Sequence, residues 1–485
     1  MRPSMPTRPA LKPRLRASRI NVLAALLLIT SQPAWSQALP ALIDAALRAT
    51  GLPASSLYLW IAPVDTGQPL LAHQAQQPAN PASLMKLATS TVALARLGPG
   101  YRWRTEIAVD QRPQDGRLHG NLYLTGRGDP QLTVERLWLL LQGLRQRGVQ
   151  HIDGDLVLDR TAFAVPDVAP GAFDGEPFKP YNVQPEALVI NYKAVTLQFR
   201  PEPAERIARV WAEPALAGWA VPATVPLAGD TDCGDWRGRL KADFSDPAGP
   251  RFAGALPAIC GDKAWPMAPP AQPQVNARAI AAMWSAVGGT LGGKVRNGFR
   301  ATSALPFFDV SSPTLAEVLR DMNKFSNNLM ADQLMLTLAL EAQGQGSWDA
   351  ARPLVNDALQ SQAGCRAEEM VIDRGSGLSR TNRLSARCLG QILQWAWISP
   401  WMPELTASLP VAGEDTAKRA TAAMGRAHLK TGSLDGVAGL AGFVDGAKGR
   451  RYVLVALLNH PRAGEGREVL NAALRWTAQQ ADAQP

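Results

Sequence analysis

The sequence predicts an α+β protein whose main domain is interrupted by a large, mostly β insertion. Helical and strand-like patterns occur near both ends of the chain, whereas the middle holds short alternating segments among loops rich in proline and glycine. The 485 residues exceed one ordinary domain, so two or three domains are expected. A hydrophobic fraction of 46% is sufficient for buried cores and argues against a disordered chain.

The first 36 residues are predicted to be a secretory signal peptide. Six lysines and arginines precede an apolar run over 20–29, and small residues follow at Ala34 and Ser36. We expect cleavage after Ser36 and a periplasmic mature protein. The alternative, an uncleaved membrane anchor, is disfavoured because spanning a bilayer takes about 20 apolar residues.

The charge of the mature chain excludes one class of partner. Removing the signal takes away six basic residues and no acid, so 44 lysines and arginines face 41 acids, a net charge of +3. This near balance gives no support for nucleic-acid binding. No later segment is long and apolar enough to span a membrane, so we expect a soluble protein without a stable transmembrane anchor.

Regular elements begin directly after the signal. Residues 39–50 read as a short helix closed by Gly51. Residues 56–62 and 70–74 read as strands joined by a turn, and 83–97 follow as a helix with apolar residues at helical spacing.

The secondary-structure pattern becomes strand-like in the middle of the chain, and helical patterns return after it. Strand-like segments are expected at 118–125, 154–159 and 187–200, and helical patterning returns at 277–287 and 313–343. The C-terminal part reads as strands 427–431, 438–444 and 451–459 and a closing helix 468–480. Strands from both ends can join one antiparallel sheet. We therefore expect a discontinuous main domain of 37–97 and 277–485, with 98–276 inserted as one or two accessory domains.

The four cysteines suit an exported protein. They form two sequence-local pairs, which favour bridges Cys233–Cys260 and Cys365–Cys388, although three pairings are open. A zinc site is the alternative, but no Cys-x-x-Cys or histidine cluster accompanies them.

Three short motifs occur in order along the chain: Ser83-x-x-Lys86, Ser326-Asn327-Asn328 and Lys430-Thr431-Gly432. Each motif alone is weak, but the three together form a set known from one group of serine enzymes.

The first motif supplies a nucleophile and a base. A serine hydroxyl needs a nearby base to attack a carbonyl. On a helix, positions i and i+3 share a face, so Lys86 lies within reach of the Ser83 hydroxyl. Free lysine, with a pKa of about 10.4, is protonated at neutral pH. Burial and a second cation, for which Lys430 is the candidate, lower that pKa.

The other two motifs are predicted to complete the site. The run 325–328 interrupts an apolar helical pattern, as a loop facing the cleft or as a capping turn between two helices. In the cleft, Ser326 would relay a proton and Asn328 would hold a substrate amide. The residues around Lys430 precede a predicted strand, whose edge can bind an extended peptide, with Thr431 or Ser433 at its carboxylate. An ordinary exposed strand start is the alternative.

Other catalytic sets are missing from the sequence. It contains no Gly-x-Ser-x-Gly, His-Glu-x-x-His, Gly-x-Gly-x-x-Gly or P-loop motif, and the five histidines lie in no known triad setting. We therefore expect neither a metal nor a cofactor.

The chain resembles the D-alanyl-D-alanine carboxypeptidase/endopeptidase family, peptidase family S13, which comprises the low-molecular-mass class C penicillin-binding proteins. Besides the three motifs, the similar features are the runs 126–130, 375–382, 430–434 and 439–443 and the long insert between Ser83 and Ser326. The likeness covers nearly the whole mature chain.

The resemblance implies a penicillin-binding-protein/β-lactamase-like catalytic domain, an antiparallel sheet flanked by helices. It implies peptidoglycan stem peptides as substrate and β-lactam antibiotics as inhibitors. By resemblance Ser83 forms the acyl-enzyme, Lys86 is the base, and Ser326, Asn328 and Lys430 complete the catalytic set. The residues Thr431, Gly432 and Ser433 are implied to bind substrate, and the backbone N–H groups of Ser83 and Ser433 to form the oxyanion hole.

One position departs from the family pattern. Arg374 stands where members often have Asp or Asn before the Gly-Ser-Gly-Leu-Ser-Arg run, and Asp373 precedes it. In that run we expect Arg380 to pair with an acidic group of the substrate, with a structural ion pair as the alternative.

Two other functions are weighed against the peptidase. A β-lactamase or esterase on a related scaffold needs a group that activates deacylating water, and no Glu-x-x-x-Asn segment stands out. A catalytically silent wall-binding protein is disfavoured by the intact motifs. The sequence leaves open a homodimer, the role of the insert, and the balance of carboxypeptidase and endopeptidase activity.

Overall fold

The computed structural model describes residues 38–229 and 232–480. The predicted signal peptide, 1–36, lies outside the described residues. Within the part that is described, every helix is too short or too polar to cross a membrane.

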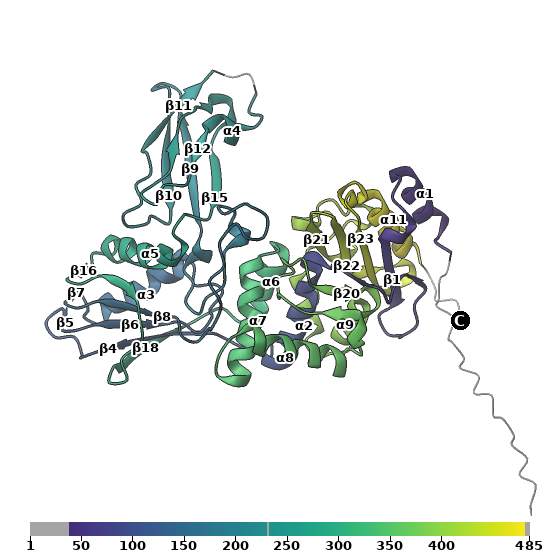
Figure 1. Cartoon of the computed structure of the whole chain (residues 1–485), viewed down its shortest axis with the longest axis horizontal. Coiled ribbons are helices and arrows are strands. Elements are labelled where there is room, and N and C mark those ends of the chain that lie inside the picture. The colour runs from purple at the N-terminus through teal and green to yellow at the C-terminus, as the bar shows by residue number, and fades with distance from the viewer. Residues whose placement is uncertain (1–37, 230–231, 481–485) are drawn as a thin grey trace, which may run out of the picture. The chain divides into compact units, whose positions relative to one another are not determined.

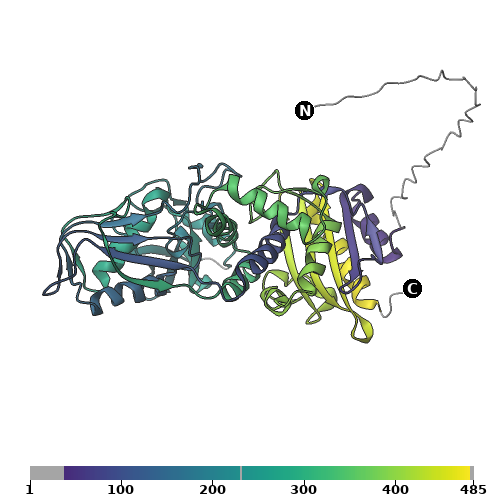
Figure 2. The ribbon, with the colours of Figure 1, turned by 90° about the horizontal axis from the view of Figure 1, so that it is seen from below.

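Strands from both ends of the chain form one antiparallel sheet, as predicted. Its order is β2-β1-β23-β22-β21, so the last strand in sequence pairs beside the first, and β21 lies at one edge. Figures 1 and 2 show the purple N-terminal strands beside the yellow C-terminal ones. The bounds are β1 Leu57–Pro63, β2 Leu71–His73, β21 Ala427–Leu434, β22 Val437–Asp445 and β23 Arg451–Asn459.

Both faces of this sheet are buried, because side chains alternate between two cores. On β1, Leu59 and Ile61 face one core, whereas Trp60 and Ala62 face the other. The first core is closed by helices α1 (Ala41–Thr50) and α11 (Arg467–Gln479). The second core is closed by α2 (Met85–Leu97), α6 (Leu315–Lys324), α7 (Asn328–Gln343), α8 (Trp348–Ser361), α9 (Ala386–Trp397) and α10 (Met402–Ser408).

The inserted block carries its own sheets and its own core. A five-stranded sheet has the order β17-β8-β6-β4-β18, and a smaller one has the order β16-β7-β5. Helices α3 (Val134–Gln146) and α5 (Gln272–Ala286) contribute to the same core. The strands are β4 Arg104–Val109, β5 Arg117–Leu118, β6 Leu122–Thr125, β7 His151–Ile152, β8 Leu156–Asp159, β16 Thr290–Leu291, β17 Val295–Asn297 and β18 Leu305–Ser311.

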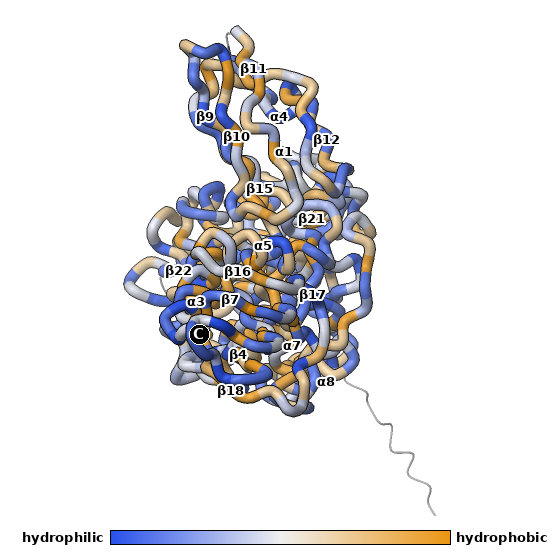
Figure 3. Tube along the Cα trace, turned by 90° about the vertical axis from the view of Figure 1, so that its left-hand side faces the viewer, coloured by the Kyte–Doolittle hydropathy of each residue, from blue (hydrophilic) through white to orange (hydrophobic). Residues whose placement is uncertain are grey.

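A second five-stranded sheet in the insert has the order β14-β11-β10-β9-β15. Hydrophobic and polar residues alternate over 195–200 of β9. Figure 3 shows hydrophobic and hydrophilic stretches mixed along this part of the insert. Five aromatic rings pack edge to face beside it, and the Cys233–Cys260 disulfide closes the region. The elements are β9 Val195–Glu202, β10 Ile207–Glu213, β11 Thr224–Ala228, α4 Trp236–Leu240, β12 Ala242–Asp243, β13 Arg251–Phe252, β14 Leu256–Pro257 and β15 Lys263–Met267.

The domain boundary predicted after Asn276 does not follow the strand pairing. It falls inside α5, and β17 and β18, which come after it, pair with β8 and β4 of the block before it. The core of the inserted block likewise extends to Val310. Helical patterning at 277–287 made this segment resemble the return of the main domain, but its partners lie in the insert.

Two predicted strands of the insert are also different. The segment 118–125 is split into β5 and β6, because Gly120 turns the chain with a φ of 102°. The strand predicted over 187–200 begins only at Val195, since Asn191, Tyr192 and Lys193 all adopt left-handed backbone conformations. Left-handed non-glycine residues cannot continue a strand.

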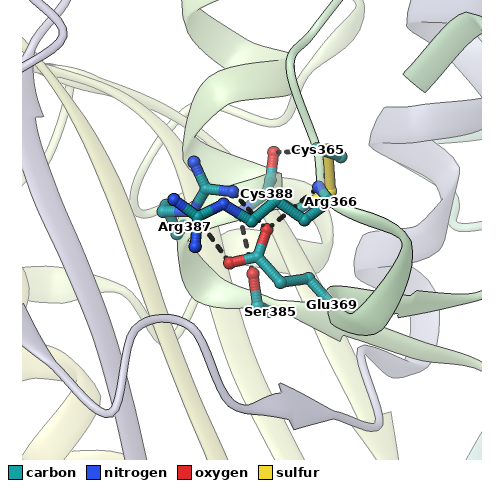
Figure 4. Close-up of a disulfide and its surroundings, with 6 residues drawn as sticks. All are labelled: Cys365, Arg366, Glu369, Ser385, Arg387 and Cys388. Carbon is teal, nitrogen blue, oxygen red and sulfur yellow. Dashed lines mark hydrogen bonds and ion pairs between the residues drawn. A yellow bond between two sulfur atoms is a disulfide. The ribbon is translucent and has the colours of Figure 1, made fainter. Parts of the chain in front are cut away.

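The second disulfide, Cys365–Cys388, joins the loop after α8 to α9 (Figure 4). The Ser385 hydroxyl accepts the Cys388 N–H at 2.9 Å and so caps α9. Beside it, Arg387 pairs with Glu369, which is almost fully buried. The neighbouring strands β19 (Met370–Val371) and β20 (Arg383–Ser385) form a small sheet with β3 (Pro78–Ala79), just before Ser83. Both disulfides predicted from the spacing of the cysteines are confirmed.

Candidate active site

Ser83 lies in a tight turn rather than in the helix itself. The sequence predicted a helix from Ser83, but residues Ala82–Leu84 form a 3₁₀ turn and α2 starts at Met85. Ala82 adopts a left-handed φ of 45°. The Asn80 side chain accepts the Ala82 N–H at 2.9 Å and donates to the Ser379 carbonyl at 3.0 Å. Asn80 thus stabilises a turn that alanine does not favour.

Lys86 lies one turn further on, against the Ser83 hydroxyl. The distance from Lys86 Nζ to Ser83 Oγ is 3.0 Å. Nζ also donates to Asn328 Oδ1 and to the Ser376 carbonyl, both at 2.7 Å. The side chain is fully buried. These contacts fix the amine next to the hydroxyl that it would deprotonate.

Burial changes the protonation of Lys86. It lowers the pKa of the Lys86 amine to about 7, and the negative charge of Asp332 opposes this shift. A pKa near the working pH is what an efficient general base needs. Sequence spacing predicted the Ser83–Lys86 pair. Burial lowers the pKa of Lys86, whereas Lys430, the expected second cation, is not among the causes of this shift.

Ser326 occupies the turn between α6 and α7, where the interruption of the helical pattern predicted it. It has a left-handed φ of 55°, and the Asn327 side chain caps α7 by accepting the Met330 N–H. The run 325–328 is therefore a capping turn between two helices, one of the two interpretations of the sequence pattern. The turn also brings Ser326 to Lys430. Asn328 is the first residue of α7, and its side chain also donates to the Tyr181 carbonyl of the insert at 3.3 Å.

Lys430 joins this turn to β21. Its Nζ donates to Ser326 Oγ at 2.8 Å and to the Thr431 carbonyl at 2.9 Å, and the side chain is fully buried. Burial, together with the charge of Lys86, lowers the pKa of Lys430 well below its usual value. The five residues predicted as catalytic thus fall into two hydrogen-bonded sets, one around Lys86 and one around Lys430, which meet at the turn of Ser326 and Asn328.

Thr431, Gly432 and Ser433 lie within β21, not before a strand as predicted. The strand is long because eight residues, from Ala427 to Leu434, pair with β22. A side chain at Gly432 would approach the Pro81 carbonyl to 2.8 Å, so glycine allows β21 to pass close to the nucleophile turn. Ser433 is exposed beside it.

A loop after β19 closes the other side of the lysine. Gly377 has a φ of 80°, and a Cβ there would meet the Ala82 carbonyl at 1.9 Å. Only glycine fits this approach, which brings the Ser376 carbonyl to Lys86. The buried Asp332 carboxylate accepts the Ser376 N–H at 2.8 Å and lies 3.5 Å from the Arg374 guanidinium.

Sequence reasoning missed Asp332. The sequence feature that could have identified it is an acidic residue one turn after Asn328, in a mainly apolar stretch of α7. Arg374, the departure from the family pattern, proves to be the partner of this buried acid and stacks on Trp348 at 4.6 Å.

Arg380 is placed apart from this group. It is exposed, donates to the Asp435 carbonyl at 3.1 Å and lies over the Phe173 ring at 4.9 Å. The positive charge of Arg380 also helps to lower the pKa of Asp174, after the hydrogen bonds that this carboxylate accepts. Arg380 and Phe173 border a cavity of about 250 Å³ between the loop 373–381 and the insert.

Metal ligation finds no support in the described parts of the chain. In residues 38–229 and 232–480, no three His, Cys, Asp or Glu side chains gather in a way that could hold a metal ion. His428, near Lys430 in sequence, lies in β21, and burial lowers its pKa. The hydroxyls of Ser83 and Ser326 lie beside the buried amines of Lys86 and Lys430, an arrangement that suits acyl transfer.

The comparisons agree with this geometry. The sequence profile of the D-Ala-D-Ala carboxypeptidase 3 (S13) family matches residues 39–480. The D-alanyl-D-alanine carboxypeptidase of Actinomadura sp. (strain R39) is 30% identical over 455 residues, which cover 87% of this chain and 81% of the relative. The D-alanyl-D-alanine carboxypeptidase DacB of Haemophilus influenzae is 27% identical over 399 residues, covering 79% and 81%.

A solved structure has the same fold. The crystal structure of penicillin binding protein 4 (dacB) from Haemophilus influenzae superposes with a TM-score of 0.71 at 23% identity. The superposition covers 89% of this chain and 99% of that one. The predicted α+β fold with its penicillin-binding-protein-like domain is therefore confirmed.

The buried Lys86 predicts how the reactivity of Ser83 depends on pH. Only the neutral amine accepts a proton, so the rate of acylation of Ser83 by a reactive ester should fall as the pH drops below about 7. In Asp332→Asn the charge that raises the pKa of Lys86 is gone, so the fall in acylation rate on the acidic side of the pH–rate profile should move to lower pH. The control is Asp373→Asn, whose carboxylate pairs with Arg352 instead. An unmoved profile in Asp332→Asn would contradict the assignment.

Proposed function

The chain belongs to the D-Ala-D-Ala carboxypeptidase 3 (S13) family, and we propose that it cuts peptidoglycan stem peptides through an acyl-enzyme on Ser83. Family membership makes it a serine-type D-alanyl-D-alanine carboxypeptidase that acts on peptidoglycan. The observation that carries the proposed mechanism is the 3.0 Å contact between Ser83 Oγ and the fully buried amine of Lys86.

In the first step neutral Lys86 takes the proton of Ser83 as the hydroxyl oxygen attacks the carbonyl of the penultimate D-alanine. The negative charge that develops on the carbonyl oxygen is stabilised by the backbone N–H groups of Ser83 and Ser433. This part of the assignment rests on the resemblance to the family. Asn328, which is hydrogen-bonded to Lys86, is proposed to hold the substrate amide.

The leaving amine needs a proton, and Ser326 is placed to supply it. Its hydroxyl accepts a hydrogen bond from the Lys430 amine, which orients it. The proton that Lys86 took from Ser83 then replaces the proton that Ser326 gives to the leaving amine. The terminal D-alanine then departs and leaves an ester on Ser83. Water hydrolyses the ester and restores the free hydroxyl.

The substrate peptide is proposed to lie along the free edge of β21. This strand ends the sheet. Its residues up to Leu429 pair with the segment 410–412, so the outer N–H and C=O groups beyond Leu429 can pair with an extended chain. Thr431, Gly432 and Ser433 occupy that edge next to the nucleophile turn. In this position the two hydroxyls would bind the terminal carboxylate. β-Lactam antibiotics, as acyl donors of similar shape, are proposed to acylate the same serine.

Export to the periplasm is proposed from the signal-like first 36 residues. Two disulfides support an oxidising compartment, because such bonds persist outside the cytoplasm. Neither the β-lactamase nor the silent wall-binding alternative is favoured by any contact among the described residues of the site.

The proposal predicts the outcome of digesting purified muropeptides. Wild-type protein should release D-alanine from pentapeptide stems, and Ser83→Ala should reduce the rate by at least about 10,000-fold because no acyl-enzyme forms. Mass spectrometry of the products checks both results. It also shows whether cross-linked dimers fall to monomers, which separates endopeptidase from carboxypeptidase activity. A Ser83→Ala protein that keeps its activity would overturn the proposal.

We also propose that Arg380 recognises the free end of a diaminopimelate side chain. Its guanidinium borders the 250 Å³ cavity and lies close enough to Asp174 to lower the pKa of that carboxyl. The carboxylate and ammonium of the diaminopimelate end would therefore each meet an opposite charge. Arg380→Ala should lower kcat/KM on diaminopimelate peptides by roughly tenfold. The same peptide with alanine in place of diaminopimelate should not be affected.

The matched control is Arg96→Ala, which removes an exposed arginine from the far end of α2. Unchanged turnover of diaminopimelate peptides by Arg380→Ala would show that Arg380 is structural.

A further inference from the structure

A line of cavities leads away from the Arg380 subsite into the insert. The cavity beside Arg380 shares the lining residues Val183 and Gln184 with a second cavity of about 370 Å³. That second cavity shares Arg160 and Glu186 with a third, of about 440 Å³, which ends at Phe299. Each pair has walls in common, so the three cavities adjoin one another. We call the second and third, both lined by residues of the insert, the outer groove.

The floor of the outer groove is polar and tightly paired. Glu186 lies at its centre, hydrogen-bonded to Arg160 and Asn276 and 3.4 Å from the Lys193 amine. Lys193 is almost fully buried there. Two cations and one anion leave a single positive charge, and Asp167 at the rim balances it. Such a floor favours a neutral ligand rich in hydrogen-bonding groups over a strongly charged one.

A solvent-exposed aromatic side chain lies at the rim of the outer groove. Phe299 follows β17 and is 78% exposed, the most exposed of the large hydrophobic side chains in the described residues. Exposed aromatic rings beside a cavity indicate a ligand. A pyranose ring offers apolar C–H faces for stacking and hydroxyl groups around its edge, which matches an aromatic rim over a polar floor.

We propose that this groove binds the glycan strand of peptidoglycan, with an N-acetylated amino sugar stacked on Phe299. The inference rests on the proposed function, because the outer groove shares a wall with the cavity that would hold the stem peptide. In this arrangement the insert holds the sugar strand while the catalytic cleft receives the peptide that branches from it.

The test uses soluble glycan strands stripped of their peptides, so binding is measured without any turnover. By isothermal titration calorimetry the full mature protein should bind these strands. Phe299→Ala should weaken binding roughly tenfold, as truncation of an aromatic anchor does. Phe299→Tyr should retain it, and Ile398→Ala, which removes a similarly exposed side chain outside the groove, should change nothing.

Three results would overturn the inference: no binding of strands by the wild-type protein, equal affinity of wild type and Phe299→Ala, or binding of free stem peptides that Phe299→Ala weakens instead. A melting temperature equal to that of the wild type separates loss of binding from loss of folding. Because the strands carry no D-alanine, a failure here is distinct from a failure of the proposed peptidase activity.

Discussion

The site is governed by two lysine amines that are taken out of water side by side. Burying an isolated ammonium costs several kcal/mol, and the group responds by releasing its proton. At Lys86 this response lowers the pKa of the amine to about 7, as its proposed role as the base for Ser83 requires. The helices α2 and α7, the edge strand β21 and the loop at Ser376 each supply one wall of the enclosure. Because those walls come from distant parts of the chain, the sheet that joins both chain ends is what allows the enclosure to form.

Bringing the walls together requires unusual backbone. Ala82 and Ser326 both adopt left-handed conformations, which cost about 1–3 kcal/mol each at non-glycine residues. Gly377 and Gly432 approach the nucleophile turn more closely than any side chain would permit. Hydrogen bonds from Asn80 help to hold this arrangement. Strain concentrated around Ser83 and Ser326 is consistent with preorganised chemistry, since the residues that react are held before substrate arrives.

Sequence patterns predicted the split sheet, both disulfides, and the two lysines with the three residues that gather around them. Local periodicity and the order of the motifs carry this information. The sequence patterns did not predict contacts between residues that are far apart along the chain. Helix α5 looked like a return to the main domain, yet β17 and β18 after it complete a sheet of the insert. Asp332 was missed because the function of an acid in a mainly apolar helix becomes evident only when the Ser376 N–H and Arg374 contact it in space.

The protonation state of Lys86 is the central claim, and it can be measured directly. Nuclear magnetic resonance of protein carrying lysine labelled at the side chain follows each amine through a pH titration, and Lys86→Arg identifies the Lys86 signal. The structure predicts that this amine titrates near pH 7. Because Lys430 is close, the two amines should titrate as a coupled pair. A Lys86 signal that titrates at the ordinary lysine value, about 10.4, would contradict the account.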